Sequence, residues 1–277
     1  MQTERRPGGR WLRWGSLACL AMLGGCSLAS VLRWPVCLPF DYVWNLGGAV
    51  EVRELRAPAD GKVRVVFCQH GLWRTSQSLD RLERSLEACG YEVVNVGYPS
   101  TEDFLEGHAA RLRDAVEARC AAGPVDELAF VGHSMGGLVI QQYLRRQDAR
   151  PPTACVYIAS PHRGAVLADQ RRHWFLFRWV MGQKAAAQLV TSDPIHLQPI
   201  PFPERAGTIV GDIGAGSASI PGRDDGTVGV AEATFDGAAD SVTLPFGHTS
   251  ILVRERTVRE VLSFLAAGRF SDGSQGR

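Results

Sequence analysis

Short apolar runs alternate along the chain with longer segments in which apolar residues recur at helical spacing. The short runs are rich in β-branched residues and predict buried strands. They are Val63 to Cys68, Tyr91 to Val96, Leu128 to Val131, Ala154 to Ile158, Thr208 to Val210 and Ser241 to Leu244, after an earlier alternating segment at Val50 to Leu55. The longer segments predict helices at Ser76 to Cys89, Thr101 to Cys120, Leu138 to Arg146 and Val258 to Leu265. We therefore expect an α/β fold with a mostly parallel central sheet and helices on both faces.

One long segment, from about residue 164 to residue 203, interrupts this alternation. It exceeds the length of an ordinary connection between a strand and its neighbour, and it is rich in aromatic residues such as Trp174, Phe175 and Trp179. Two interpretations are open: a helical, lid-like insertion over a site, or extra helices that extend the core.

The first 25 residues have the pattern of a secretory signal peptide. Several arginines precede an apolar stretch, Leu17 to Leu23, which is shorter than the roughly 20 residues that a membrane-spanning helix needs. The segment Leu23 to Cys26 resembles the lipobox of bacterial lipoproteins. This resemblance implies cleavage before Cys26 and lipidation of that cysteine; an ordinary signal peptide with a chance cysteine is the alternative.

These patterns predict how the chain is divided. We expect a signal peptide over residues 1–25, a tether or lead-in over 26–48, one large domain over 49–268 and a disordered tail over 269–277. A lipid on Cys26 would place the protein in the bacterial cell envelope, anchored at the outer membrane or the periplasmic face.

Charge and cysteine spacing narrow the classes of function. The formal net charge is +1 and no basic stripe is interleaved with aromatic residues, so a nucleic-acid partner is not expected. The seven cysteines form no Cys-x-x-Cys or Cys/His spacing, so no metal site is expected. Cys68 and Cys155 fall in predicted strands, where buried thiols are inert.

The pattern Gly132-His133-Ser134-Met135-Gly136 stands between a predicted strand and a predicted helix. A sharp turn from strand to helix, with a glycine on each side, leaves the serine projecting in a strained conformation. The amide of Met135 then lies at a helix N-terminus, where it can stabilise an oxyanion. The context therefore favours a nucleophilic serine over a plain glycine-rich turn.

Further motifs follow the same order along the chain as in a known superfamily: His70-Gly71, Ser160-Pro161-His162-Arg163-Gly164, Asp225-Gly226-Thr227-Val228 and Gly247-His248. With the serine motif, they resemble the α/β-hydrolase-fold lipases and esterases over about residues 63–267. The segment around His162 is similar to the Pro-His-x-Gly motif of bacterial true lipases. The resemblance implies the α/β-hydrolase fold, and it is specific to the superfamily rather than to a substrate.

In terms of this family, Ser134 is the nucleophile, His248 the base and Asp225 the acid, in the chain order that the fold uses. Asp225 is preferred because a turn through the following glycine can direct its carboxylate back to His248. Asp224 is a close rival, and Asp212 follows the fifth predicted strand directly.

The loop after the first buried strand is expected to supply a second oxyanion donor, the amide of Leu72, beside that of Met135. The histidines that flank these groups, His70 and His133, are expected to be structural. His108 and His196 are expected to be packing or surface residues, like His173 in the insertion.

These residues predict a serine hydrolase that cleaves carboxylic esters, with lipid or acyl esters favoured by the apolar insertion. The chemistry of such a triad requires no metal and no organic cofactor. Two alternatives are kept: an acyltransferase or thioesterase of the same fold, and a non-catalytic envelope protein that binds a lipid or a partner.

Overall fold

The computed structural model describes residues 49–50, 53–171, 184–214 and 216–271, and the features below concern these residues. The predicted signal peptide, Cys26 and the tether lie outside them, as do the aromatic residues in the middle of the insertion. Within the described ranges, no helix is both long enough and apolar enough to cross a membrane.

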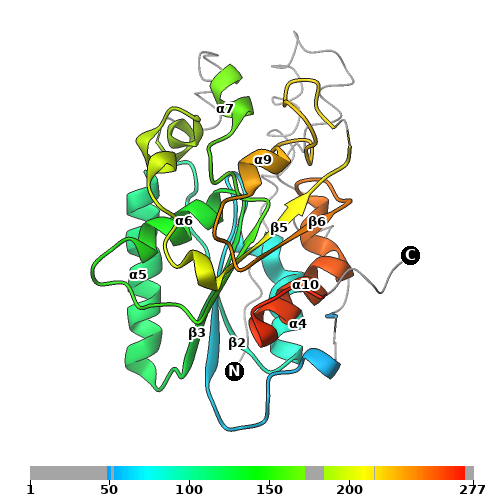
Figure 1. Ribbon diagram of the computed structural model, residues 1–277. Helices are drawn as coiled ribbons and strands as arrows, with labels where there is room; N and C mark the ends of the chain where they lie inside the picture. Colours follow the sequence, from blue (N-terminus) through cyan, green and yellow to red (C-terminus); the bar gives the residue numbers. More distant parts are fainter. Residues whose placement is uncertain (1–48, 51–52, 172–183, 215, 272–277) are drawn as a thin grey trace, which may run out of the picture. The chain divides into compact units, whose positions relative to one another are not determined.

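A six-stranded sheet forms the centre of the domain, in the order β2-β1-β3-β4-β5-β6 (Figure 1). The strands are β1 (Arg64–Gln69), β2 (Glu92–Val96), β3 (Glu127–His133), β4 (Ala154–Ile158), β5 (Ala206–Gly211) and β6 (Asp240–Leu244). Every pairing is parallel, so the carboxyl ends of the strands meet at one edge. The predicted parallel α/β fold is confirmed, and the residues that follow these strands are brought together.

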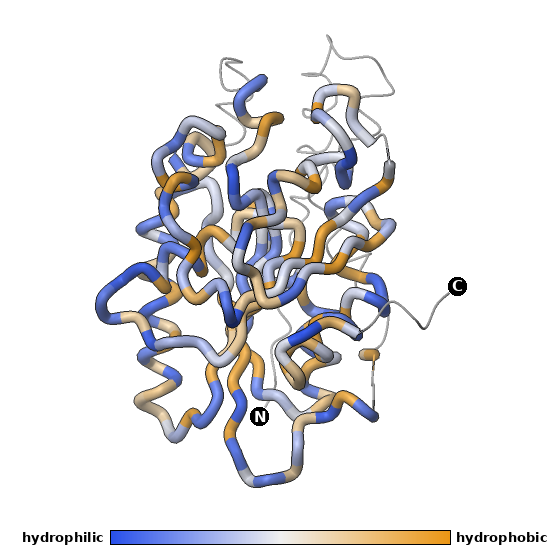
Figure 2. Tube along the Cα trace, viewed as in Figure 1, coloured by the Kyte–Doolittle hydropathy of each residue, from blue (hydrophilic) through white to orange (hydrophobic). Residues whose placement is uncertain are grey.

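Two hydrophobic cores lie on opposite faces of the sheet, each under a pair of helices (Figure 1). On one face, α4 (Asp80–Ala88) and α10 (Glu255–Ala267) contribute Leu86 and Val261. On the other face, α5 (Leu105–Ala122) and α6 (Met135–Leu144) pack over Phe130. Hydrophobic stretches accordingly run through the central strands in Figure 2. Each fully buried leucine or phenylalanine contributes about 1.5–3 kcal/mol to this layered arrangement.

The remaining helical segments are short. They are η1 (Arg53–Leu55), η2 (Ser76–Leu79), α7 (Val166–Arg171), η3 (Ala185–Leu189), η4 (Pro194–Leu197), η5 (Pro203–Arg205), α9 (Val230–Ala233) and η6 (Ser250–Val253). Three of them, α7, η3 and η4, belong to the insertion.

The predicted early strand at Val50 to Leu55 is wrong. Residues 53–55 form a 3-10 helix, and Val50 is buried with its amide donating to the hydroxyl of Ser85 at 2.9 Å. The apolar residues here, Val50 and Leu55, belong to the core under α4 and α10 rather than to a further strand of the sheet.

The predicted helix from Thr101 begins later, at Leu105. The Leu105 amide donates to the side chain of Gln188 at 2.7 Å, so a residue of the insertion satisfies the start of α5. At the other end of the chain, the predicted tail is ordered as far as the structure describes it. Phe270 is buried, its ring centroid lies 5.0 Å from that of Phe264, and its amide donates to Asp240.

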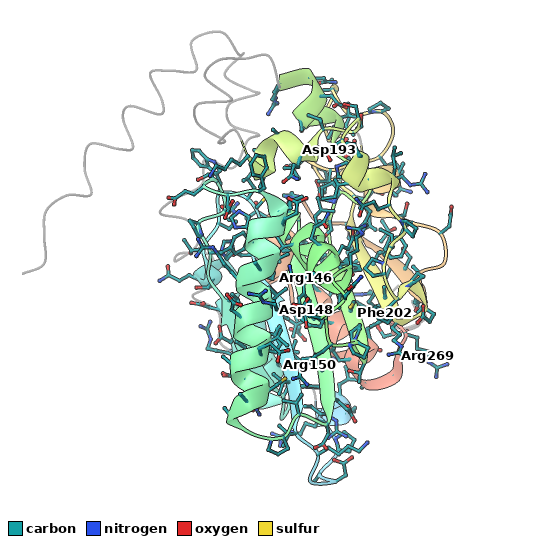
Figure 3. All side chains as sticks on the ribbon, turned by 90° about the vertical axis from the view of Figure 1, so that its left-hand side faces the viewer. Arg146, Asp148, Arg150, Asp193, Phe202 and Arg269 are labelled. Atoms are coloured by element: carbon teal, nitrogen blue, oxygen red, sulfur yellow. The ribbon has the colours of Figure 1, made fainter. Side chains whose placement is uncertain are left out.

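Both described flanks of the insertion are attached to the domain. The Ala165 amide donates to the carbonyl of Leu189 at 2.8 Å, which joins the two flanks to each other. The Ala185 amide donates to the carbonyl of Asp103 at 2.9 Å, next to the start of α5. Asp193, labelled in Figure 3, caps η4 by accepting the amide of Ile195. Movement of the middle of the insertion, as a lid, stays a prediction.

The outer surface near α5 carries ion pairs of mixed sign rather than a basic patch. Arg146 pairs with Asp148 at 2.8 Å, and Arg150 pairs with Glu117 at 2.9 Å; three of these side chains are labelled in Figure 3. Exposed pairs of this kind contribute at most about 1 kcal/mol each.

Candidate active site

Ser134 lies in the turn between β3 and α6, with φ 54° and ψ −127°. Such a backbone conformation costs a residue with a side chain roughly 1–3 kcal/mol, so the surrounding packing must hold it. The flanking glycines permit that packing. A Cβ on Gly132 would lie 2.7 Å from the Cα of Gly137, and a Cβ on Gly136 would overlap the carbonyl oxygen of Gln69. The motif therefore forms the strained strand-to-helix turn that its sequence predicts.

Three side chains from different loops form one hydrogen-bonded chain. The Nε2 of His248 lies 3.0 Å from the Oγ of Ser134, and its Nδ1 lies 2.7 Å from an Oδ2 of Asp225. A carboxylate only accepts, so Nδ1 carries the proton and Nε2 is left to accept the serine proton. The Asp225 side chain is 1% exposed and that of His248 is 11% exposed, so this contact is shielded from solvent.

The structure separates the three acids that the sequence left as alternatives. Asp225 reaches His248, and its other oxygen accepts the amides of Thr227 and Val228 at 2.9 and 2.7 Å. Asp224 is also buried, but its carboxylate accepts the amides of Ser217 and Gly226 instead. Asp212 accepts the amide of Gly214 and pairs with Arg223. Among the three, Asp225 is the acid in contact with the base.

The loop after β1 lies directly against the serine. A Cβ on Gly71 would come within 3.0 Å of the Ser134 Cβ, so Gly71 packs directly against the serine, and Leu72 follows it in the loop. Met135 is the first residue of α6, and an amide at that position has no acceptor within its own helix. The two residues predicted to carry the oxyanion amides thus lie next to Ser134 in the chain, at Met135, and next to the glycine packed against it, at Leu72; their role as donors stays a prediction.

Tyr98 holds this loop in place, a contact that the sequence did not reveal. Its hydroxyl donates to the carbonyl of His70 at 2.6 Å, and its amide donates to the Nε2 of His70 at 3.2 Å. The Nδ1 of His70 donates to the carbonyl of Gly71 at 2.9 Å. His70 is therefore neutral and structural, as expected, and it fixes the backbone just before Leu72.

His133 is structural too, but it touches the base. Its Nε2 donates to the main-chain carbonyl of His248 at 2.9 Å, and the two ring centroids are 4.9 Å apart. Burial, reinforced by the neighbouring His248, holds the pKa of His133 well below its ordinary value. A neutral, buried imidazole thus supports the loop that carries His248. Arg74 also supports this loop by donating to the hydroxyl of Thr249 at 2.6 Å.

The Pro-His-x-Gly histidine does not join the chain of three. His162 is buried, its Nδ1 lies 2.5 Å from the side-chain nitrogen of Gln141, and its ring packs edge-on against Tyr157. Burial lowers the pKa of His162 to about 3. His196, in the insertion, contacts the carbonyls of His162 and Gln188. His108 is fully buried against Tyr98, so His108 and His196 are both packing residues. His173 lies outside the described residues.

No group of histidine, cysteine, aspartate and glutamate side chains that could hold a metal ion occurs among the residues that the structure describes. Cys68 and Cys155 are buried in β1 and β4, and burial raises the pKa of the Cys155 thiol to about 12.

A parallel sheet with a strained serine at the end of its third strand, a histidine and a buried aspartate defines the class of α/β hydrolases. The sequence model of the alpha/beta hydrolase family matches residues 65–263, and the chain belongs to this family. A comparison with curated protein sequences gave no match.

Solved structures share the fold at low sequence identity. A lipase of Bacillus licheniformis, BlEst2 in its mature form, superposes with a TM-score of 0.57 at 22% identity, over 76% of this chain and 93% of that one. The metagenomic carboxyl esterase MGS0156 superposes with a TM-score of 0.55 at 20% identity, over 69% of this chain and 68% of that one. At such identities the similarity concerns the fold.

Proposed function

We propose that the protein is a serine hydrolase that cleaves carboxylic esters through an acyl-enzyme. The observation that carries the proposal is the unbroken chain from the Ser134 hydroxyl to the Nε2 of His248, and from its Nδ1 to the buried carboxylate of Asp225. A serine becomes an effective nucleophile when a neutral base accepts its proton and an acid orients that base.

The first half-reaction forms the acyl-enzyme. The Oγ of Ser134 attacks the acyl carbon as its proton passes to His248, and Asp225 stabilises the imidazolium. The carbonyl oxygen becomes an oxyanion that accepts the amides of Leu72 and Met135, each worth about 3 kcal/mol in such a site. The intermediate then collapses, the bond to the leaving oxygen breaks, and His248 returns the proton to the alcohol.

The second half-reaction releases the acid. His248 takes a proton from water, whose oxygen attacks the acyl carbon, and a second tetrahedral intermediate collapses to a carboxylic acid and free Ser134. Proton, nucleophile and leaving group are all accounted for by these side chains and water, so the proposed reaction needs no metal and no organic cofactor.

An acyl or lipid ester is the substrate class that we favour, because the insertion is aromatic and apolar. A lipid on Cys26 would hold the enzyme on an envelope membrane, within reach of such substrates. Both proposals rest on the sequence, since these residues lie outside the described part of the chain. Metabolic labelling with an alkyne fatty acid tests the anchor: wild type carries the label and Cys26→Ser does not.

Hydrolysis of p-nitrophenyl esters of increasing chain length tests the activity and its preference. We expect Ser134→Ala to lose at least about 10³-fold in kcat/KM, as expected for removal of a nucleophile. Ser241→Ala, an exposed serine on β6, is the matched control and keeps wild-type rates. Equal hydrolysis by Ser134→Ala would refute the proposal. Thioester substrates and competing alcohols distinguish the thioesterase and acyltransferase alternatives by their products.

A further inference from the structure

Glu232 is a buried carboxylate that the proposed reaction does not use. It lies in α9 and is 8% exposed. One oxygen accepts the amide of Gly229 at 2.9 Å, and the other accepts the amide of Val166, also at 2.9 Å. Among the ion pairs between described residues, none involves Glu232, so these backbone amides are what stabilise its charge.

The two amides belong to different parts of the molecule. Gly229 ends the segment from Asp224 to Gly229, which we call the acid loop. Val166 is the first residue of α7, where the insertion begins. The amide of Arg163 adds a third link by donating to the main-chain carbonyl of Glu232 at 3.3 Å. Glu232 therefore joins the acid loop to the start of the insertion.

The acid loop determines where the carboxylate of Asp225 points. The Val228 amide, one residue before Gly229, donates to Oδ1 of Asp225 at 2.7 Å, and the Asp225 amide donates back to the carbonyl of Val228 at 3.1 Å. The main-chain carbonyl of Asp225 in turn accepts the amide of His248 at 2.9 Å. A shift at Gly229 is therefore transmitted to both the acid and the base.

Burying a charged carboxylate at this position costs free energy, and the hydrogen bonds that its two oxygens accept offset this cost. Burial raises the pKa of Glu232, and the nearby carboxylates of Asp225 and Asp169 raise it further. The two backbone amides act in the opposite direction. A side chain with one acceptor would satisfy the start of α9 or the start of α7, but not both.

We propose that Glu232 is a positioning residue that holds the acid loop, and with it Asp225, against the start of the insertion at α7. This inference rests on the proposed function, because it assigns Glu232 an effect on the Ser134–His248–Asp225 chain. It acts through Asp225 and touches neither the substrate nor the reacting atoms.

Glu232→Ala and Glu232→Gln test the proposal with a soluble short-chain ester. We expect kcat to fall by about 10²-fold in Glu232→Ala, as when a catalytic group is displaced by about 1 Å, and by less in Glu232→Gln, which keeps one acceptor. KM stays unchanged, because the substrate does not touch Glu232. The acid limb of the kcat/KM profile moves to lower pH, since the imidazolium of His248 is less well stabilised by a displaced Asp225.

Val166→Pro supplies a second variant in case the glutamate variants do not fold. It removes only the amide that donates to Glu232, at the first position of a helix, where proline is tolerated. We expect the same direction of change in kcat and in the acid limb. Asp169→Asn is the matched control, because Asp169 accepts hydrogen bonds from the amide and hydroxyl of Thr191, within the insertion, rather than from the acid loop.

Active-site titration with a fluorophosphonate separates the possible failures. If wild type is not labelled, the proposed function itself fails. If wild type is labelled, and the Glu232 variants turn over at the wild-type rate per labelled site with an unchanged pH profile, Glu232 only stabilises the fold and the inference is overturned. Equal losses in Asp169→Asn would also overturn it, because loosening the insertion would then be sufficient.

Discussion

Replacing Asp225 by asparagine tests which acid serves the base. The change keeps the size of the side chain and leaves Oδ1 to accept the amides of Thr227 and Val228. The new NH2 group, however, would face the Nδ1–H of His248 across 2.7 Å, donor against donor. The imidazole relieves this conflict by moving its proton to Nε2, which then faces Ser134 without a free lone pair.

The expected loss follows from that tautomer. A base that has to leave its preferred tautomer before each turnover typically loses about 10⁴-fold in kcat, or about 5.5 kcal/mol. The Asp225 carboxylate accepts three hydrogen bonds, and asparagine would accept two of them. We therefore also expect a decrease of about 1–2 kcal/mol in the free energy of unfolding. Steady-state hydrolysis of a p-nitrophenyl ester gives the first quantity, and urea unfolding gives the second.

Asp224→Asn is the control for this experiment, since Asp224 is also buried and is adjacent, but among the described residues its carboxylate accepts the amides of Ser217 and Gly226 and does not reach His248. We expect it to lower stability by about 1–3 kcal/mol while the rate per folded molecule falls by less than about tenfold. If Asp224→Asn is the more damaging of the two to kcat, the assignment of the acid is wrong.

Three further predictions concern packing and titration. Gly136→Ala should lower the free energy of unfolding by at least about 1–3 kcal/mol and reduce activity, because the new Cβ would overlap the Gln69 carbonyl. The control Gly97→Ala, whose Cβ would lie 3.6 Å from its nearest neighbour, should change neither stability nor activity. Equal melting temperatures for the two variants would contradict the prediction. His162 has a folded-state pKa of about 3, below that of the unfolded chain, so the unfolded state binds more protons below about pH 6.5 and stability falls as the pH is lowered. His162→Asn should reduce that slope by up to about 1.4 kcal/mol per pH unit in urea unfolding between about pH 6.5 and 4, and an unchanged slope would refute the effect. Cys68 and Cys155 are fully buried with raised thiol pKa values, so iodoacetamide should alkylate them only after unfolding; rapid labelling of the folded protein, read by peptide mapping, would disagree.

The strands and the serine turn could be predicted because their signals are local. A buried strand needs a short apolar run, and the sharp turn at Ser134 needs Gly132 and Gly136 beside it. The same local reasoning failed at Val50 to Leu55, where residues 53–55 form a 3-10 helix, and Val50 and Leu55 pack into the core without joining the sheet. It also placed the start of α5 too early, because the capping group is Gln188, distant in sequence.

The groups that support the site were beyond prediction for a related reason. Tyr98 and Glu232 act through main-chain carbonyls and amides of other loops, and such backbone contacts leave no motif in the sequence. His133 was expected to be structural, but its contact with the His248 carbonyl was not. Asp224 and Asp225 illustrate the same limit: adjacent aspartates in one turn look alike in sequence, and only the fold determines which carboxylate faces His248.

The central claim is that Ser134 is an activated nucleophile, and intact-mass spectrometry after treatment with a fluorophosphonate tests it most directly. We predict a single adduct on wild type, located on the peptide that contains Ser134, and none on Ser134→Ala. Labelling should also drop sharply in Asp225→Asn, which retains the serine but not the orientation of its base. An adduct of equal yield on Ser134→Ala, or no adduct on folded wild-type protein, would contradict the account.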